Sequence, residues 1–353
     1  MTRPALARFD LEALRHNYGL AKRLHGARAL AVLKADAYGH GAVRCAQALH
    51  GLADAFAVAF LEEAVTLREA GITAPILVLE GVFAANEMRT IRQLCLWTVV
   101  HHEAQLKMIE RCDTPAGLHI WLKVDSGMGR AGFALKDIAR THGRLLANHR
   151  VEEITLMTHF ARADEADSGA TEAQIAAFDA ATRTLAGPRS LCNSAGVLAW
   201  DRARRDWARP GIMMYGANPI PGSAEDLRPV MTLQSEVFAT RDLLPGDPLG
   251  YGAAFTADRP TRVGLVALGY ADGYPRAAPN GTPVSVNGAR SRLIGRVSMD
   301  MLTVDLTDFP EAGIGSTVEL WGSQVSVGKV AQCSGTIPYE LLCNVKRARR
   351  VYE

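Results

Sequence analysis

Short apolar runs alternate with amphipathic stretches over the first two thirds of the chain. Eight of these runs have the length and composition of buried strands. They span residues Ala29–Ala35, Ala55–Phe60, Ala74–Glu80, Leu96–His101, Leu118–Asp125, Glu153–His159, Ser190–Ser194 and Trp207–Met213. Helical patterns separate them, and strands that alternate with helices form parallel sheets. Eight such repeats predict a closed (β/α)8 barrel of the TIM type rather than an open sheet.

Two of the helical stretches carry recognisable end signals. "LEEAVTLREAG" places Glu62 and Glu63 in its first turn and Gly71 just beyond its last. "TEAQIAAFDAATRTLAG" begins with Thr171, which we expect to be the N-cap.

After residue 228 the helical pattern largely disappears. "TPVSVNGARSRLIG" predicts a hairpin with Asn287 and Gly288 at its turn. "MLTVDL" and "STVEL" alternate apolar and polar residues with period two, as half-buried strands do. We therefore divide the chain into a barrel, residues 1–228, and a mainly β domain, residues 229–353. The first few residues are also candidates to pack with the β domain.

Composition narrows the possible function classes. A length of 353 residues suits two domains. A net charge of +2 gives no footprint for nucleic acid. No apolar run is long enough to span a membrane, and the N-terminal stretch lacks the apolar core of a secretion signal. Six cysteines without a C-x-x-C pair predict reduced, buried thiols in a cytoplasmic protein.

Polar residues gather where the predicted strands end. In "ALAVLKADAYGHG", five apolar residues lead directly into Lys34, and a buried ammonium is costly unless it is paired or chemically used. Other strand ends carry Asp125, His159, Asn193, Ser194, Arg209 and Gly211. Because active sites of such barrels lie at the carboxyl ends of the strands, we predict the active site at this rim.

A lysine in this position can form a Schiff base with a carbonyl substrate or with pyridoxal phosphate. Barrels often bind phosphate with the loops after strands 7 and 8, and here those loops read "NSAG" and "RPGIMMYG". Ser194 offers a hydroxyl and Gly211 allows close backbone approach. The N–H groups of Ser194, Gly211 and Ile212 can donate, and Tyr38 can add a phenolic donor. This set favours pyridoxal phosphate, and no metal ligand set is predicted.

Nine ordered stretches identify a family. They are "AVLKADAYGHG", "LKVDSGMGRAGF", "THFARAD", "CNSAG", "RPGIMMYG", "GYGAAF", "GYADGYPR", "GRVSMDM" and "IPYE". Over essentially its whole length the chain resembles the alanine racemase family of pyridoxal-phosphate enzymes, most closely the bacterial catabolic type. The resemblance implies a barrel followed by a β domain, L-alanine and D-alanine as substrates, and a homodimer with shared active sites.

The resemblance also implies the catalytic roles. Lys34 binds the cofactor covalently and then acts as the base on one face of the substrate. Tyr251, in "GYGAAF", is supplied by the second subunit and acts on the opposite face. Arg209 is the partner of the pyridine nitrogen, and because arginine holds its proton it donates a hydrogen bond without transferring that proton. His159 lies near Arg209 and can link it to Tyr251.

Further residues are implied around the substrate. Arg130 is expected near the phenolic oxygen of the cofactor and the substrate carboxylate. Lys123 matches a position that is carbamylated in some members, the alternative being a lysine paired with a carboxylate. Met299, followed by Asp300, supplies a backbone donor to the carboxylate across the dimer interface. Tyr339 forms an inner gate with Tyr251. The corridor through which substrate enters is expected to be lined by Asp164, Tyr270, Arg296 and Ile337.

Four other functions are compatible with parts of this pattern, and particular sequence features argue against most of them. A non-catalytic carrier of pyridoxal phosphate would lack the β domain and Tyr251. An amino-acid decarboxylase of the same architecture would carry a glycine-rich phosphate loop that this sequence lacks. A cofactor-free aldolase leaves the phosphate-binding residues unexplained. A racemase of broader specificity stays open, although Tyr339 argues against large substrates.

Overall fold

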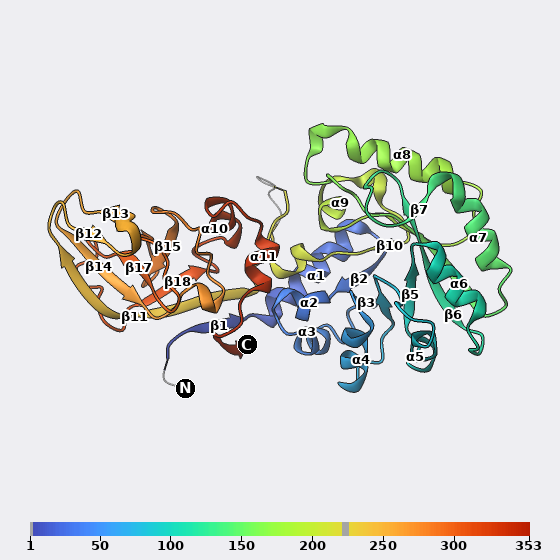
Figure 1. The fold of residues 1–353 in the computed structure, drawn as a ribbon, viewed down its shortest axis with the longest axis horizontal. Helices are drawn as coiled ribbons and strands as arrows, with labels where there is room; N and C mark the ends of the chain where they lie inside the picture. The colour runs from blue at the N-terminus through green and yellow to red at the C-terminus, as the bar shows by residue number, and fades with distance from the viewer. Residues whose placement is uncertain (1–2, 221–225) are drawn as a thin grey trace.

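The computed structural model describes residues 3–220 and 226–353 and has two lobes, one around a parallel sheet and one around antiparallel strands (Figure 1). The parallel strands are hydrogen-bonded in the order β10-β2-β3-β4-β5-β6-β8-β9, with β7 added beside β6. Beyond β9 and β10 the Arg209 N–H donates to the Cys192 carbonyl at 2.9 Å, which nearly closes the barrel. The strands are β2 Arg28–Val32, β3 Ala55–Val58, β4 Ile76–Val78, β5 Trp97–Val100, β6 Leu118–Asp125, β7 Phe133–Ala134, β8 Val151–Met157, β9 Arg189–Ser190 and β10 Trp207–Ala208. The predicted fold class is confirmed.

Helices surround the parallel sheet (Figure 1). They are α1 Leu11–His25, α2 Lys34–Tyr38, α3 Ala42–Ala48, α4 Leu61–Glu69, α5 Glu87–Gln93, α6 Glu103–Arg111, α7 Ile138–Leu146, α8 Ala170–Thr182 and α9 Ser194–Ala199. At the start of α4 the Glu63 carboxylate accepts the N–H groups of Ala59 and Phe60. The expected N-cap at Thr171 is wrong, because the chain enters α8 from Gly169 in the left-handed conformation and Thr171 already lies inside the helix.

Three tryptophans fill the interior of the barrel. The Trp97 ring lies 6.1 Å from Trp121 and 5.6 Å from Trp207, between ring centroids. Trp97 and Trp207 are the first residues of β5 and β10, so this cluster fills the amino-terminal half. Free space for a ligand is therefore left at the carboxyl ends of the strands.

The second lobe includes a strand from each end of the chain. β1 Leu6–Phe9 pairs antiparallel with β11 and parallel with β19. The other strands are β11 Met231–Leu243, β12 Pro248–Leu249, β13 Phe255–Thr256, β14 Thr261–Val266, β15 Pro283–Val286, β16 Ala289–Arg292, β17 Leu302–Asp305, β18 Thr317–Trp321 and β19 Arg349–Tyr352. The expected hairpin is present as β15 and β16, with Asn287 and Gly288 at positive φ of 48° and 85°. Two short helices, α10 Val327–Cys333 and α11 Pro338–Cys343, were not predicted.

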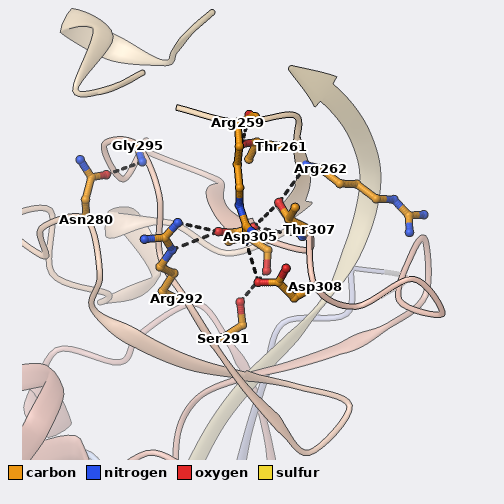
Figure 2. Close-up of polar contacts among 10 residues, drawn as sticks. All are labelled: Arg259, Thr261, Arg262, Asn280, Ser291, Arg292, Gly295, Asp305, Thr307 and Asp308. Atoms are coloured by element: carbon orange, nitrogen blue, oxygen red, sulfur yellow. Dashed lines mark hydrogen bonds and ion pairs between the residues drawn. The ribbon is translucent and has the colours of Figure 1, made fainter. Parts of the chain in front are cut away.

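A buried carboxylate organises the core of this lobe. Asp305, 5% exposed, accepts two hydrogen bonds from Arg292 at 3.0 and 2.9 Å and two more from Thr307 (Figure 2). Burial raises the pKa of Asp305, but the bonds from Thr307 and Arg292 outweigh it and hold the pKa below the ordinary value. Through these hydrogen bonds, Asp305 in β17 connects to Arg292 in β16 and to Thr307 in the turn after β17.

Three further features bear on function class. All six cysteines are unpaired, and Cys95 is exposed, which corrects the expectation that the thiols are buried. Within the described residues, no helix combines the length and apolar character needed to cross a membrane. In residues 3–220 and 226–353, no cluster of His, Cys, Asp or Glu could hold a metal ion.

Candidate active site

A cavity of about 870 Å³ opens at the carboxyl ends of the barrel strands. Of the predicted residues it is lined by Lys34, Tyr38, Lys123, Arg130, His159, Asp164, Ser194, Arg209, Gly211, Ile212, Ile337 and Tyr339. The last two lie at the start of α11, so the second lobe forms part of the wall. A cavity of about 850 Å³ at the opposite end, beside α1, holds none of the predicted site residues.

Lys34 lies two residues beyond β2, in a turn with a left-handed backbone. The φ angles of Ala35 to Tyr38 lie between 53° and 55°, and the Gly39 N–H donates to the Ala35 carbonyl at 3.0 Å. Such backbone costs L-residues about 1–2 kcal/mol each. Because Lys34 and Tyr38 are one turn apart, both side chains reach the cavity. The expectation that the strand continues to Ala35 is wrong, since an apolar run does not reveal where the backbone changes hand.

The loops after β9 and β10 meet the Tyr38 side chain. Ser194 Oγ accepts the N–H groups of Gly211 at 2.9 Å and Met213 at 3.4 Å. A Cβ on Gly211 would lie 2.5 Å from the Tyr38 hydroxyl, so glycine is needed for this approach. Burial raises the pKa of Tyr38, which keeps its hydroxyl a donor, and no described residue hydrogen-bonds that hydroxyl. This is a set of donors suited to a phosphate.

Arg209 crosses the floor of the cavity and is 5% exposed. One terminal nitrogen donates to Ser190, at 2.9 Å to its carbonyl and 2.5 Å to its hydroxyl, and the other donates to the Thr158 carbonyl at 2.5 Å. Among the described residues the Nε–H has no partner, so it is the donor left for a ligand. Burial lowers the pKa of Arg209 to about 10, and the side chain still carries its charge at neutral pH.

His159 is the neighbour of Arg209. Its Nδ1 lies 3.5 Å from an Arg209 terminal nitrogen. Because a guanidinium only donates, Nδ1 is the acceptor and the proton of the ring lies on Nε2. Burial, and then the charge of Arg209, lower the pKa of His159 well below its ordinary value. The ring is therefore neutral at neutral pH.

The cavity carries an excess of positive charge. Within the described residues its basic side chains are Lys34, Lys123, Arg130, Arg209 and Lys329, and its carboxylates are Glu80 and Asp164. Burial lowers the pKa of Lys123, and Glu80 opposes that shift. Lys123 makes no ion pair in the part of the chain that the structure describes, so the expected alternative of a paired lysine is not seen. An anionic ligand fits this charge.

The turn that follows Asp125 forms one wall of the cavity, and the ring of Tyr339 forms part of another. Asp125 Oδ1 accepts the N–H groups of residues 127, 128 and 129 at 3.0 to 3.1 Å, which fixes the turn leading to Arg130. Partial burial raises the pKa of Asp125, but these three bonds outweigh it and lower the pKa. Across the cavity the Tyr339 ring lies 5.9 Å from the Tyr38 ring, and burial raises the pKa of Tyr339 to about 12.

Five predicted residues do not line the cavity: Tyr251, Tyr270, Arg296, Met299 and Asp300. Tyr251 and Met299 are 67% and 54% exposed, and Asp300 pairs with Arg347 at 2.9 Å. The turn of Tyr251 is held by Asn280, which donates to the Ala254 carbonyl at 2.5 Å. Asn280 also accepts the Gly295 N–H at 2.6 Å (Figure 2). A single chain therefore does not bring Tyr251 to Lys34.

Sequence reasoning missed two charged residues of the cavity. Glu80 follows β4 much as Lys34 follows β2, so the strand-end rule could have found it. Lys329 lies on α10, a helix that the sequence pattern did not reveal.

Comparison with known proteins decides the family. The model of the alanine racemase N-terminal domain matches residues 9–219, and that of the alanine racemase C-terminal domain matches residues 230–352. The chain belongs to the alanine racemase family. It is accordingly an enzyme of the isomerase class, and members of this family interconvert L-alanine and D-alanine.

Individual relatives extend over the whole chain. An alanine racemase of Azoarcus sp. (strain BH72) is 64% identical and covers 98% of both chains. A catabolic alanine racemase of Pseudomonas putida is 59% identical and covers 99% of both. Among solved structures, the biosynthetic alanine racemase from Pseudomonas aeruginosa is 48% identical, with a TM-score of 0.97 over 100% of both chains. The alanine racemase from Bartonella henselae, solved with covalently bound pyridoxal phosphate, is 29% identical, with a TM-score of 0.88 over 99% of both.

Proposed function

We propose that this enzyme racemises alanine with pyridoxal phosphate bound in the cavity, and with Lys34 and Tyr251 of the partner subunit as its two bases. The observation that carries the proposal is the shared wall of the cavity. Lys34, the Tyr38 hydroxyl and the backbone at Gly211 face one space, and the Arg209 Nε–H lies at its floor. Neither that hydroxyl nor that N–H has a hydrogen-bond partner among the described residues.

The residues present fit the cofactor end by end. Tyr38, Ser194 and the backbone N–H groups of Gly211 and Ile212 would hold the phosphate. Lys34 would bind the carbonyl carbon, and the Arg209 Nε–H would donate to the ring nitrogen. When bound, the cofactor withdraws electrons from the amino acid attached to it and so makes the Cα–H acidic.

Lys34 and Tyr251 then move the proton at Cα. With the amino acid attached to the cofactor, the Lys34 amine would be free beside Cα and could take or return a proton on one face. Racemisation needs a second acid–base group on the opposite face of Cα. In the scheme proposed here, the described residues that line the cavity do not supply this group. Tyr251 of the partner subunit fills this role, which explains its exposure in the single chain.

Arg209 and His159 tune this chemistry without entering it. Because Arg209 keeps its proton, it would donate a hydrogen bond to the ring nitrogen of a bound cofactor without charging it, which would limit electron withdrawal and disfavour transamination. The neutral His159 accepts from Arg209 through Nδ1, so its Nε2–H would be free to donate to the second base.

Specificity for a small substrate comes from charge and crowding. Arg130 and the backbone N–H of Met299 from the partner subunit would hold the carboxylate, with Asp300 following Met299 at the interface. Tyr339 limits the space beyond Cα to a methyl group. Asp164 and Ile337, with Tyr270 and Arg296 of the partner, would line the approach to the cavity. A carbamylated Lys123 would turn a buried cation, which has no ion-pair partner among the described residues, into an anion that faces Arg130.

An absorbance spectrum of the purified enzyme tests the cofactor. A visible band that borohydride bleaches, with the label mapped to Lys34, is the expected result, and Lys34→Ala removes the band. Chiral analysis of alanine after incubation with each enantiomer gives the activity. Absence of the band in active, purified protein supplied with pyridoxal phosphate contradicts the proposal.

A further inference from the structure

The left-handed turn that carries Lys34 and Tyr38 contains polar groups to which the mechanism gives no role. Asp36 lies within the turn, and His40 lies two residues beyond its last residue, Tyr38. The turn matters because it is what aims Lys34 and Tyr38 into one cavity. Four consecutive non-glycine residues at positive φ persist only when surrounding contacts determine them.

His40 supplies contacts of this kind from inside the protein. Its ring is fully buried, and its Nδ1 lies 3.0 Å from the Ala37 carbonyl and 2.9 Å from the Tyr38 carbonyl. Because carbonyl oxygens only accept, Nδ1 carries the proton and donates to both. The Nε2 atom is buried without a partner among the described residues. Within the described residues, all hydrogen bonds of the His40 ring are therefore directed at the turn.

The His40 ring is also held in place by its neighbours. Its centroid lies 5.4 Å from that of Phe9 in β1 and 4.5 Å from that of Tyr215. The Tyr215 hydroxyl donates to the Val32 carbonyl at 2.8 Å, at the end of the strand that leads into the turn. His40 is thus fixed against both lobes.

Asp36 ties the turn to the second lobe. One carboxylate oxygen accepts the Ala42 N–H at 2.8 Å, and the other binds the Arg350 guanidinium in β19 at 2.8 Å. The backbone just after the turn also approaches two segments of the second lobe closely. A Cβ on Gly39 would lie 2.3 Å from the Leu342 carbonyl, and one on Gly41 would lie 2.3 Å from the Tyr352 hydroxyl.

We propose that His40 is a positioning residue of the active site. Its Nδ1–H holds the turn in the left-handed form that places Lys34 and Tyr38 on one wall of the cavity, and the Asp36–Arg350 pair ties that turn to the second lobe. The inference rests on the proposed function in that Lys34 and Tyr38 hold the cofactor. The opposing view is that His40 only fills space in the core.

Three substitutions separate these views. His40→Phe keeps a ring against Phe9 and Tyr215 but removes the donor. His40→Asn keeps an N–H donor near the position of Nδ1 and loses bulk. His40→Gln moves the donor about one bond further out. Each variant is prepared without cofactor, its fold is checked by circular dichroism and thermal unfolding, and pyridoxal phosphate is then titrated.

Two readouts are followed, the dissociation constant and the rate at which borohydride-reducible label appears on Lys34. For His40→Phe and His40→Gln we expect the dissociation constant to rise and the labelling rate to fall, each by about tenfold or more, as for loss of a buried hydrogen bond. His40→Asn is expected to stay within about threefold of the parent enzyme. A folded His40→Phe that binds and labels like the parent overturns the proposal, and so does a folded His40→Asn that fails as badly as His40→Phe.

A second pair of variants tests the Asp36–Arg350 ion pair without changing a residue of the buried core. Arg350→Gln removes the partner of Asp36, and Arg349→Gln removes a charge from the adjacent position of β19, which makes no ion pair among the described residues. Only Arg350→Gln should slow labelling, and combining it with Asp36→Asn should add little further loss. Equal effects of Arg350→Gln and Arg349→Gln overturn the role of the pair. If the parent enzyme itself never labels at Lys34, the proposed function fails, whatever the variants do.

Discussion

Burial decides which side chains of the cavity carry a proton. It lowers the pKa of Arg209 to about 10 and raises that of Tyr339 to about 12, so both keep their protons at neutral pH. It lowers the pKa of His159, which is therefore neutral. None of these three groups is tuned to exchange a proton near neutral pH, which agrees with the proposal that Lys34 and Tyr251 of the partner subunit are the bases.

Replacing Tyr251 with phenylalanine should damage the two directions unequally. The hydroxyl that serves one face of Cα is lost, while Lys34 still serves the other. We expect exchange of the Cα hydrogen of L-alanine in deuterated water to fall by about 10²-fold or more, the scale of general acid–base catalysis. Exchange from D-alanine without inversion should survive in part. The measurement follows each enantiomer separately by NMR.

Phenylalanine at Tyr270, another exposed tyrosine of the same lobe, is the matched control and should keep the two exchange rates in the parent ratio. Equal loss for both enantiomers in Tyr251→Phe, with cofactor still bound, would mean that the faces are assigned wrongly.

His40 should make the protein sensitive to acid. The pKa of His40 is lowered from 6.5 to about 4, chiefly by burial. The bonds to the Tyr38 and Ala37 carbonyls oppose this shift, the charge of Arg350 adds to it, and that of Asp36 opposes it. The unfolded chain therefore binds a proton at higher pH than the folded one, so stability is complete above about pH 6.5 and falls as the pH drops toward 4. Between pH 7 and pH 5 this amounts to about 2 kcal/mol.

Urea unfolding of the cofactor-free protein at both pH values measures this term. His40→Asn lacks the titrating ring, so its free energy of unfolding should fall by about 2 kcal/mol less than that of the parent over the same interval. The other titrating groups are common to both proteins and cancel. Identical pH dependence of the two proteins would show that His40 does not titrate as its burial requires.

At the scale of elements, the sequence predicts the order of the barrel strands better than their ends. β6 has the predicted limits because Leu118 to Asp125 is a long apolar run that ends in a carboxylate. β9 and β10 are two residues each, since the chain bends early to form the loops around Ser194 and Gly211. The conformation of Ala35 to Tyr38 depends on contacts with α11 and β19, distant segments that no local pattern reveals.

The glycine at the start of the eighth loop offers a test of the cradle. Gly211→Ala would place a Cβ 2.5 Å from the Tyr38 hydroxyl, so the phenol must move. We expect the dissociation constant of pyridoxal phosphate to rise about tenfold or more, by fluorescence titration. Gly143→Ala on α7, where nothing lies within 4 Å of the added carbon, should leave binding unchanged.

Adding Tyr38→Phe to Gly211→Ala removes the clashing hydroxyl. The double variant should therefore bind the cofactor about as well as Tyr38→Phe alone. Strictly additive losses would indicate that Gly211 acts through its own backbone and not through the space it leaves for Tyr38.

For the whole molecule, Lys34 lies in the barrel and Tyr251, the proposed second base, lies in the β lobe. Through Ile337 and Tyr339, the β lobe contributes one side of the cavity in the barrel of the same chain. Tyr251 lies between β12 and β13, strands that are well away from that contact (Figure 1). The sequence could suggest the shared site only through resemblance, because exposure of Tyr251 is a property of the folded chain. In the proposed shared site, a head-to-tail homodimer would place the two together.

Mixing two inactive chains should restore activity. Lys34→Ala and Tyr251→Phe each remove one base from every site of their homodimers. Subunit exchange then creates heterodimers in which one site is doubly defective and the other is intact. At equal proportions half of the dimers are mixed, so about a quarter of the parent activity per site is expected. Native mass spectrometry confirms exchange, and mixed dimers that remain inactive contradict the shared site.

The pairing of β1 has a consequence for how the protein is made. Leu6 in β1 is matched with Arg349 in β19, and the entire barrel lies between them in the chain. During synthesis β1 leaves the ribosome long before β11 and β19 exist, so it stays an unpaired strand edge while the barrel folds. Unpaired edges are prone to join other chains. In a circular permutant that moves this strand behind β19, the strand would be synthesised after both of its partner strands and could pair at once. The permutant's yield of soluble protein during rapid expression should exceed that of the parent.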